Sequence, residues 1–302
     1  MTIPETSHET SRESIPETSR ESIRESIPET SRESIRESIR ESIPLTSPET
    51  GSESTPRGAL LLGATGRTGG RVLQQLLERG IPVRVIVRSA ERLTPSAAGV
   101  AAAPLTVVEA EVAAMEPEEL RRHLEDCDTV ISCLGHAPHL RGVFGPPRDL
   151  VEGAVRVVCE AAASLKPASP IRLILMSSVS VNRPARADTR RGAGERAFVG
   201  LVRALVPPAR DNQRAADYLA REIGKDHPFV SWVVVRPDSL VEGEPSAYRT
   251  HDGLVASLFR PDKTRMSNVA RFMAELTRDD AAWRRWRGRM PVIVDEAAKS
   301  GV

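Results

Sequence analysis

The chain has 302 residues, a length that fits one large domain or two small ones. Its net charge of +1 gives no overall attraction to nucleic acid or an anionic membrane, and no apolar run reaches the ~18–20 residues that span a bilayer. The three cysteines lack metal-ligand spacing, and their odd number argues against a disulfide framework. We therefore expect no metal site, no nucleic-acid partner and a reducing, cytoplasmic setting.

The first 56 residues form a low-complexity segment in which glutamate falls at every fourth position from Glu5 through Glu41. Prolines recur, aromatic residues are absent, and the few aliphatic side chains cannot offset the entropy of ordering the chain. We predict a disordered tail over residues 1–56 and a folded domain over residues 57–302. We interpret the tail as an expanded repeat without a role, and a repeat-type binding arm is the alternative.

After residue 57 the chain alternates strand-like apolar runs with helical patterns. The predicted strands cover residues 59–62, 83–87, 105–108, 129–134, 171–176 and 230–235, and the predicted helices cover residues 68–79, 117–125, 149–165 and 212–223. The strands are nearly continuous in apolar residues, which is typical of a sheet covered by helices on both faces. This order predicts an α/β fold with a doubly wound parallel sheet, whose ligands bind at the carboxyl ends of the strands.

Between the first strand and the first helix lie three glycines, Gly63, Gly66 and Gly69, at the spacing Gly-x-x-Gly-x-x-Gly. We expect Gly63 to turn the chain off the strand, Gly66 to let a pyrophosphate approach, and Gly69 to let the helix lie close to the sheet. The strand before and the helix after these glycines favour nucleotide binding over a turn that is merely rich in glycine.

The next two strand ends are interpreted as the adenosine side of the nucleotide site. Arg88, with Ser89 beside it, stands where an enzyme that prefers NAD usually has an acid, and a guanidinium can pair with a 2′-phosphate. We therefore predict that NADP(H) is preferred over NAD(H), and a solvated arginine is the alternative. Glu111 and Val112 follow the third strand and are candidates for the adenine edge, although Glu111 is equally well explained as an exposed loop acid.

The fourth strand ends in residues that are expected to pass under the cofactor. Leu134 and Gly135 are candidates for contact with its ribose and phosphates, and Cys133 is interpreted as a small apolar strand residue. His136 is interpreted as a histidine of a surface loop, and phosphate contact or proton donation is the alternative.

The fifth and sixth strands end in candidates for the nicotinamide side. The hydroxyls of Ser177 and Ser178 can orient a carboxamide or a substrate carbonyl, and Ser178 is the candidate catalytic residue. Serines that cap the strand end are an equally weighted alternative. Arg236 and Pro237 end the sixth strand, and Pro237 is expected to turn the chain over the nicotinamide end of the cleft.

The C-terminal third offers weaker signals. The basic loop that contains Arg186, Arg190 and Arg191 can contact an anionic ligand, although a solvated loop is favoured. A helix is predicted over residues 267–276 with Ser267 as its cap, and residues 290–294 are expected to form a last edge strand. Trp283 and Trp286 are expected to pack at the bottom of the domain or to form a dimer contact.

Several of these segments together resemble the atypical short-chain dehydrogenase/reductase superfamily, in its NAD(P)H-binding, NmrA-like and flavin-reductase (biliverdin-reductase-B-like) branch. The residues that carry the resemblance are Gly63, Ala64, Thr65, Gly66, Arg67, Thr68 and Gly69, followed by Val87–Arg88, Ser132–Gly135, Met176–Ser178 and Val234–Pro237. The resemblance covers residues 57–295. It implies a Rossmann-type fold, NADP(H) bound along these segments, and a small C-terminal substrate region.

One family feature is missing. Members of the wider superfamily use a Tyr-x-x-x-Lys pair, but Tyr218 and Tyr248 are each followed at that spacing by an acid, and Pro208 and Asn212 fall where the pair is expected. We therefore predict an NADPH-dependent oxidoreductase that passes hydride to a small-molecule acceptor of the flavin, quinone or carbonyl type. The alternatives are a non-catalytic NADP(H)-binding sensor of the NmrA-like type and, more distantly, an epimerase or dehydratase. Whether the protein forms a homodimer is left open.

Overall fold

The structure is a computed structural model that describes residues 57–93, 103–136, 145, 147–183, 188 and 191–296. All of these residues belong to the compact unit Ser54–Val302. The predicted tail, residues 1–56, lies outside the described residues.

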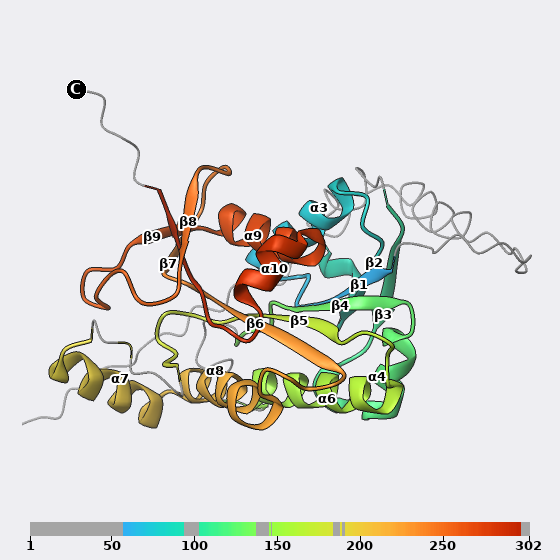
Figure 1. The fold of residues 1–302 in the computed structure, drawn as a ribbon, viewed down its shortest axis with the longest axis horizontal. Coiled ribbons are helices and arrows are strands. Elements are labelled where there is room, and N and C mark those ends of the chain that lie inside the picture. The colour runs from blue at the N-terminus through green and yellow to red at the C-terminus, as the bar shows by residue number, and fades with distance from the viewer. Residues whose placement is uncertain are drawn as a thin grey trace, which may run out of the picture. The chain divides into compact units, whose positions relative to one another are not determined.

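A mostly parallel sheet of eight strands forms the centre of this unit (Figure 1). Its strands, in spatial order, are β3 (Leu105–Glu109), β2 (Val83–Val87), β1 (Gly58–Leu62), β4 (Cys127–Ser132), β5 (Ile171–Met176), β6 (Val230–Pro237), β10 (Val292–Asp295) and β8 (Tyr248–His251). The β8 strand pairs antiparallel with β10, whereas every other pair in this sheet is parallel. Since the strand order reverses between β1 and β4, a crevice is expected at their carboxyl ends. The sheet confirms the predicted Rossmann-type, doubly wound fold.

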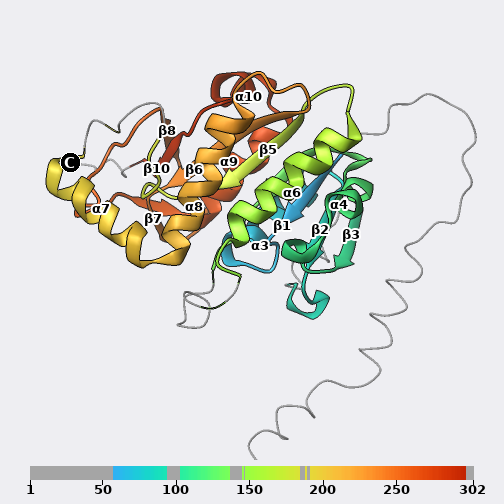
Figure 2. The same ribbon diagram turned by 90° about the horizontal axis from the view of Figure 1, so that it is seen from below.

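Helices cover both faces of the sheet, as the continuous apolar strands predicted. One layer contains α3 (Arg67–Glu78), α9 (Met266–Arg278) and α10 (Asp280–Trp286), and the other contains α4 (Pro117–Leu124), α6 (Leu150–Leu165) and α8 (Pro207–Tyr218). Figure 2 shows α4, α6 and α8 across one face of the sheet. Within β1, Ala59 and Leu61 pack into one core and Leu60 and Leu62 into the other, so burial on both faces explains why the strand is apolar throughout.

Shorter elements connect these layers. A two-stranded sheet pairs β7 (Ser239–Val241) with β9 (Lys263–Arg265), and α7 (Ala193–Leu205) precedes α8. Single turns cover Ala90–Arg92, Val112–Ala114 and Leu219–Ile223. Among the described helices, none has the length and apolar character needed to cross a membrane.

Three sequence predictions about the later elements were wrong. Ser267 is not the cap of α9 but lies within the helix, where its hydroxyl donates a hydrogen bond to the carbonyl of Gly243. The last strand, β10, is not at the edge, because β8 adds a further strand beyond it. The helix predicted to begin at residue 212 begins at Pro207, since a proline is tolerated in the first turn of a helix.

Candidate nucleotide site

The glycine-rich turn between β1 and α3 is packed directly against the carboxyl end of β4. Gly63 has a φ of 81°, and a Cβ there would lie 2.7 Å from the backbone of Cys133. A Cβ at Gly69 would lie 2.0 Å from the carbonyl oxygen of Gly63. Positive φ and close backbone contact both exclude a side chain, so these two glycines are required by the turn itself. The predicted roles of Gly63 in turning the chain and of Gly69 in close packing agree with this geometry.

The N-terminus of α3 is available to an anion. Gly66 is its N-cap residue, no side chain within the described structure caps the helix, and its first turn contains no acidic residue. The first N–H groups of a helix have no partner inside the helix, and its dipole places partial positive charge at this end. These features suit a phosphate group, with Thr65 half-buried beside the turn and Thr68 buried within it.

Two arginines of α3 are held by one carboxylate. The Arg67 guanidinium lies 2.6 Å from Oε1 of Glu242, and Arg71 pairs with the other oxygen of the same carboxylate. All three side chains are at least one-third exposed, and the Arg67 guanidinium lowers the pKa of Glu242 by hydrogen bonding. Arg67, predicted to contact the cofactor, therefore also ties α3 to the segment that follows β7.

The adenosine-side candidates follow β2 and β3. Arg88 is exposed and has no ion-pair partner among the described residues, so its guanidinium is open to a ligand. Ser89 is half-buried beside it. Glu111 is exposed and precedes a turn in which Val112 is buried, so Val112 forms part of the core beneath that loop.

Two serines at the ends of β4 and β5 have buried hydroxyls without a hydrogen-bond partner in the described structure. These are Ser132, the last residue of β4, and Ser177, which follows β5. A buried hydroxyl without a partner is costly, which favours a ligand group at this place. Next to Ser132, Leu134 is half-buried and Gly135 is exposed.

Ser178 has local partners. Its hydroxyl lies 2.5 Å from the hydroxyl of Ser180 and accepts a hydrogen bond from the Ser180 N–H at 3.2 Å. This is the capping arrangement that the sequence allowed as an alternative. A hydroxyl can still donate to a ligand from this position, because it carries both a donor and acceptor lone pairs.

The end of β6 is a buried ionic cluster. Arg236 is fully buried, and its guanidinium donates to the carboxylate of Asp188 at 2.9 Å and to the carbonyls of Met290 and Val181 at 3.0 Å. Arg191 is also buried and donates to the carbonyl of Val179, so the favoured interpretation as a solvated arginine was wrong for this residue. Arg186 and Arg190 lie outside the described residues. These bonds give Arg236 a structural role, and its predicted contact with the cofactor stays a prediction.

Pro237 is the last residue of β6, and its carbonyl accepts the N–H of Val179 at 3.1 Å. The segment after β5 is thereby fastened to the end of β6. Its predicted place over the nicotinamide end of the cleft stays a prediction.

His136 is buried against Asp211, so its interpretation as a surface histidine was wrong. The two side chains are 4% and 0% exposed, and Nε2 of His136 lies 2.8 Å from Oδ2 of Asp211. The same carboxylate accepts the N–H groups of Val151 and Glu152, both at 2.8 Å, at the start of α6. Asp211 therefore caps α6 from the neighbouring helix α8, which explains why no local sequence signal marks it.

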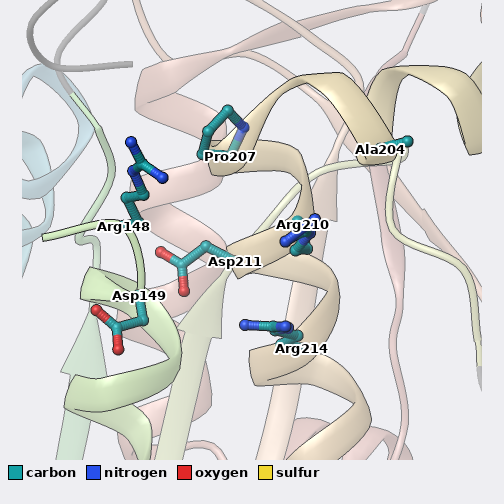
Figure 3. A pocket seen from close by; sticks show the side chains of 7 residues that line it. All are labelled: Arg148, Asp149, Ala204, Pro207, Arg210, Asp211 and Arg214. Atoms are coloured by element: carbon teal, nitrogen blue, oxygen red, sulfur yellow. The ribbon is translucent and has the colours of Figure 1, made fainter. Parts of the chain in front are cut away.

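A cavity of about 370 Å³ lies beside this pair, between the N-terminal ends of α6 and α8 (Figure 3). Its lining residues are Arg148 and Asp149 before α6, Ala204 near the end of α7, and Pro207, Arg210, Asp211 and Arg214 on α8. Because α6 follows β4 and α8 precedes β6, both helices begin at the carboxyl edge of the sheet. The cavity therefore lies at the edge where ligands bind in such folds.

A family model described as NAD(P)H-binding matches residues 63–280. The chain belongs to this NAD(P)H-binding family. The match begins at the first glycine of the turn, and it confirms the NAD(P)H-binding family that the motifs indicated. No curated protein sequence matches the chain.

Solved structures with low sequence identity share the fold of this NAD(P)H-binding protein. The oxidoreductase ylbE from Lactococcus lactis is 19% identical with a TM-score of 0.56, over 79% of this chain and 91% of that one. The anaerobillin reductase ChuY from Escherichia coli O157:H7 is 18% identical with a TM-score of 0.54, over 81% of this chain and 100% of that one. A Rossmann-fold NAD(P)-binding family protein from Shigella flexneri is 16% identical with a TM-score of 0.51, over 82% of this chain and 98% of that one.

Neither tyrosine of this NAD(P)H-binding protein belongs to the glycine-rich turn or to the strand ends around it. Tyr218 ends α8 with its ring 4.1 Å below the guanidinium of Arg156, and burial raises its pKa to about 12. Tyr248 lies on the edge strand β8, where burial raises the pKa of its phenol, which also donates to Glu275.

The positions where the Tyr-x-x-x-Lys pair was expected both lie in α8, where the Asn212 side chain donates to the carbonyl of Pro208 at 2.9 Å.

Proposed function

We propose that this protein is an NADPH-dependent oxidoreductase that transfers hydride to a small-molecule acceptor of the flavin, quinone or carbonyl type. The observation that carries the proposal is the uncapped N-terminus of α3, held against β4 by Gly63 and Gly69. Membership of the NAD(P)H-binding family supports it. The unpartnered hydroxyls of Ser132 and Ser177 support a ligand that continues along the same edge of the sheet.

Each part of the cofactor has a candidate partner. Backbone groups from Gly63 to Gly69 would hold the pyrophosphate, and Arg88 with Ser89 would hold the 2′-phosphate that distinguishes NADP(H). The remaining contacts would come from Glu111 and Val112 at adenine, Leu134 and Gly135 at ribose, Ser177 at the carboxamide, and Arg236 and Pro237 at the nicotinamide end. When bound, the nicotinamide supplies the hydride.

The residues of this chain favour acceptors that need little help with proton transfer. The Ser178 hydroxyl would orient an acceptor oxygen by hydrogen bonding, but no tyrosine–lysine pair stands beside it to lower a phenol pKa. Flavins and quinones take up hydride into an extended conjugated system, so their reduction depends less on a general acid than reduction of an isolated carbonyl does.

A non-catalytic NADP(H)-binding sensor is the second candidate function. The specific observation that favours it is the engagement of both tyrosines elsewhere, Tyr218 with Arg156 and Tyr248 with Glu275. Such a protein would need only the cofactor contacts.

Two measurements separate these functions. Calorimetry with NADPH and NADP⁺ tests cofactor binding, and NADPH oxidation against a panel of flavins, quinones and aldehydes tests catalysis. We expect binding of NADPH and turnover with at least one flavin or quinone. Tight binding without turnover across the panel would favour the sensor, whereas absence of any binding would refute both functions.

A further inference from the structure

We propose that the cavity between α6 and α8 binds an anionic group, a carboxylate or a phosphate monoester, of the molecule that accepts the hydride. This inference rests on the proposed oxidoreductase function and names the class of its acceptor. The cavity of about 370 Å³ falls within the size range of small-molecule sites, ≈ 300–1,000 Å³.

Three arginines from two separate elements line the cavity. Arg148 reaches from the loop before α6, and Arg210 and Arg214 stand one turn apart on α8 (Figure 3). Arg148 and Arg210 have no ion-pair or hydrogen-bond partner for their side chains within the described parts of the chain. Arg214 lies 3.8 Å from Glu152, a carboxylate that Arg156 approaches more closely at 3.1 Å.

All three arginine side chains are exposed, so their guanidinium groups are solvated by water and can contact an incoming anion. Arg210 and Arg214 carry like charges four residues apart on one helix, and these charges repel each other. Guanidinium groups bind carboxylate and phosphate through paired hydrogen bonds. A bound oxyanion would therefore reduce the repulsion between the arginines and replace their contacts with water by charge-assisted hydrogen bonds.

The two acids of the cavity do not neutralise the arginines. Asp211 is fully buried, and its oxygens already accept hydrogen bonds from His136 and from the N–H groups at the start of α6. Asp149 is exposed, makes no capping hydrogen bond and forms no ion pair with the three arginines. The lining thus keeps an excess of positive charge, with three arginines against two aspartates.

The position of the cavity assigns the anion to the acceptor and not to the cofactor. Arg88, the candidate for the 2′-phosphate, follows β2 on one side of β1, whereas α6 and α8 belong to the half of the sheet formed by β4, β5 and β6. The two halves of such a fold bind the two halves of a dinucleotide. The cavity therefore lies on the side of the sheet that would bind the nicotinamide half of the cofactor, which is the side that the acceptor must approach.

The test uses two acceptor pairs that differ in one anionic group, with the full-length protein saturated with NADP⁺. Flavin mononucleotide against riboflavin tests the phosphate source, and 4-carboxybenzaldehyde against its methyl ester tests the carboxylate source. We expect the anionic member of at least one pair to bind about tenfold more tightly, because hydrogen bonds to charged groups are stronger than those between neutral groups.

Variants then assign that preference to the cavity. The double variant Arg148→Gln/Arg210→Gln should lose the preference, whereas the matched control Arg122→Gln/Arg284→Gln should keep it. The control removes two exposed arginines from α4 and α10, so the change in net charge is the same. Thermal unfolding verifies that both variants are folded.

The outcomes are distinguishable from failure of the proposed function. If the protein fails to bind NADPH, the oxidoreductase proposal is wrong, and this inference with it. If NADPH binds but neither anionic compound is preferred over its neutral partner, only the anion site is refuted. The anion site is also refuted if both double variants lose the preference equally, because the effect is then one of overall charge.

Discussion

The close contact between Gly69 and Gly63 makes Gly69→Ala the sharpest test of the nucleotide site. The added Cβ would lie 2.0 Å from the Gly63 carbonyl oxygen, 2.8 Å from its carbon and 3.3 Å from Cα of Ala64. All three contacts are with backbone atoms, so no flexible side chain can move aside, and α3 must shift relative to the turn. Overpacking of this kind costs roughly 1–3 kcal/mol of folding stability.

The same shift should weaken cofactor binding. The N–H groups of the first turn of α3 move with the helix, and their hydrogen bonds to a charged phosphate are worth roughly 1.5–3 kcal/mol. A loss of about 1.4–2.8 kcal/mol corresponds to a 10- to 100-fold weaker Kd for NADPH. Calorimetry measures that Kd, and urea unfolding measures the free energy of unfolding.

Gly153→Ala is the matched control. Gly153 lies in α6, and a Cβ there meets nothing within 4 Å. An alanine in a helix interior should raise the free energy of unfolding by roughly 0.5–1 kcal/mol and leave NADPH binding unchanged. If Gly69→Ala binds NADPH with the affinity of the wild type, the phosphate site at this turn is wrong.

Three further predictions follow from single residues. Arg88→Asp should weaken NADPH binding at least about tenfold and leave NADH binding unchanged, because a charge-assisted hydrogen bond to the 2′-phosphate is lost and the new carboxylate repels that phosphate. Competition titrations measure the preference. An unchanged preference for NADPH would show that Arg88 is not part of the site. Asp211→Ala should lower the free energy of unfolding by about 3 kcal/mol, because it leaves His136 and two N–H groups of α6 without their buried partner. Urea titrations measure this free energy. A decrease below about 0.5 kcal/mol, the size of a neutral surface substitution, would contradict the prediction. Burial raises the Tyr218 pKa from 10.0 to about 12, so its contribution to stability is full below pH 10 and is lost as pH rises from 10 to about 12. Tyr218→Phe should reduce that loss. In the variant Tyr248→Phe, Tyr218 is the remaining tyrosine, and a phenolate that titrates near 10 in its ultraviolet absorption would disprove the burial argument.

Much of the fold could be predicted because its signals are local. The strands of the central sheet read as short apolar runs, and the structure places all six predicted ones within one or two residues at each end. The nucleotide turn could also be predicted from the sequence, because a positive φ at Gly63 and a backbone contact at Gly69 each require a residue without a side chain. The edge strand β8 was missed because its sequence, Tyr-Arg-Thr-His, has no apolar run.

Only part of the candidate site could be predicted from the sequence. Strand ends pointed to Arg88, Ser177 and Gly135, because the carboxyl ends of parallel strands meet at one edge. The buried pair of His136 and Asp211 had no sequence signal, since 75 residues separate its members.

The sequence by itself determined the apolar strands of the sheet, the glycine turn and the absence of the Tyr-x-x-x-Lys pair. Each of these features depends on residues within a few positions of one another. Only the tertiary structure decided which polar residues are buried together. It placed Arg236 with Asp188, capped α6 with Asp211 from another helix, and brought arginines of two elements to one cavity. Such contacts depend on how α6 and α8 pack, and the free energy that selects this packing is distributed over the whole core.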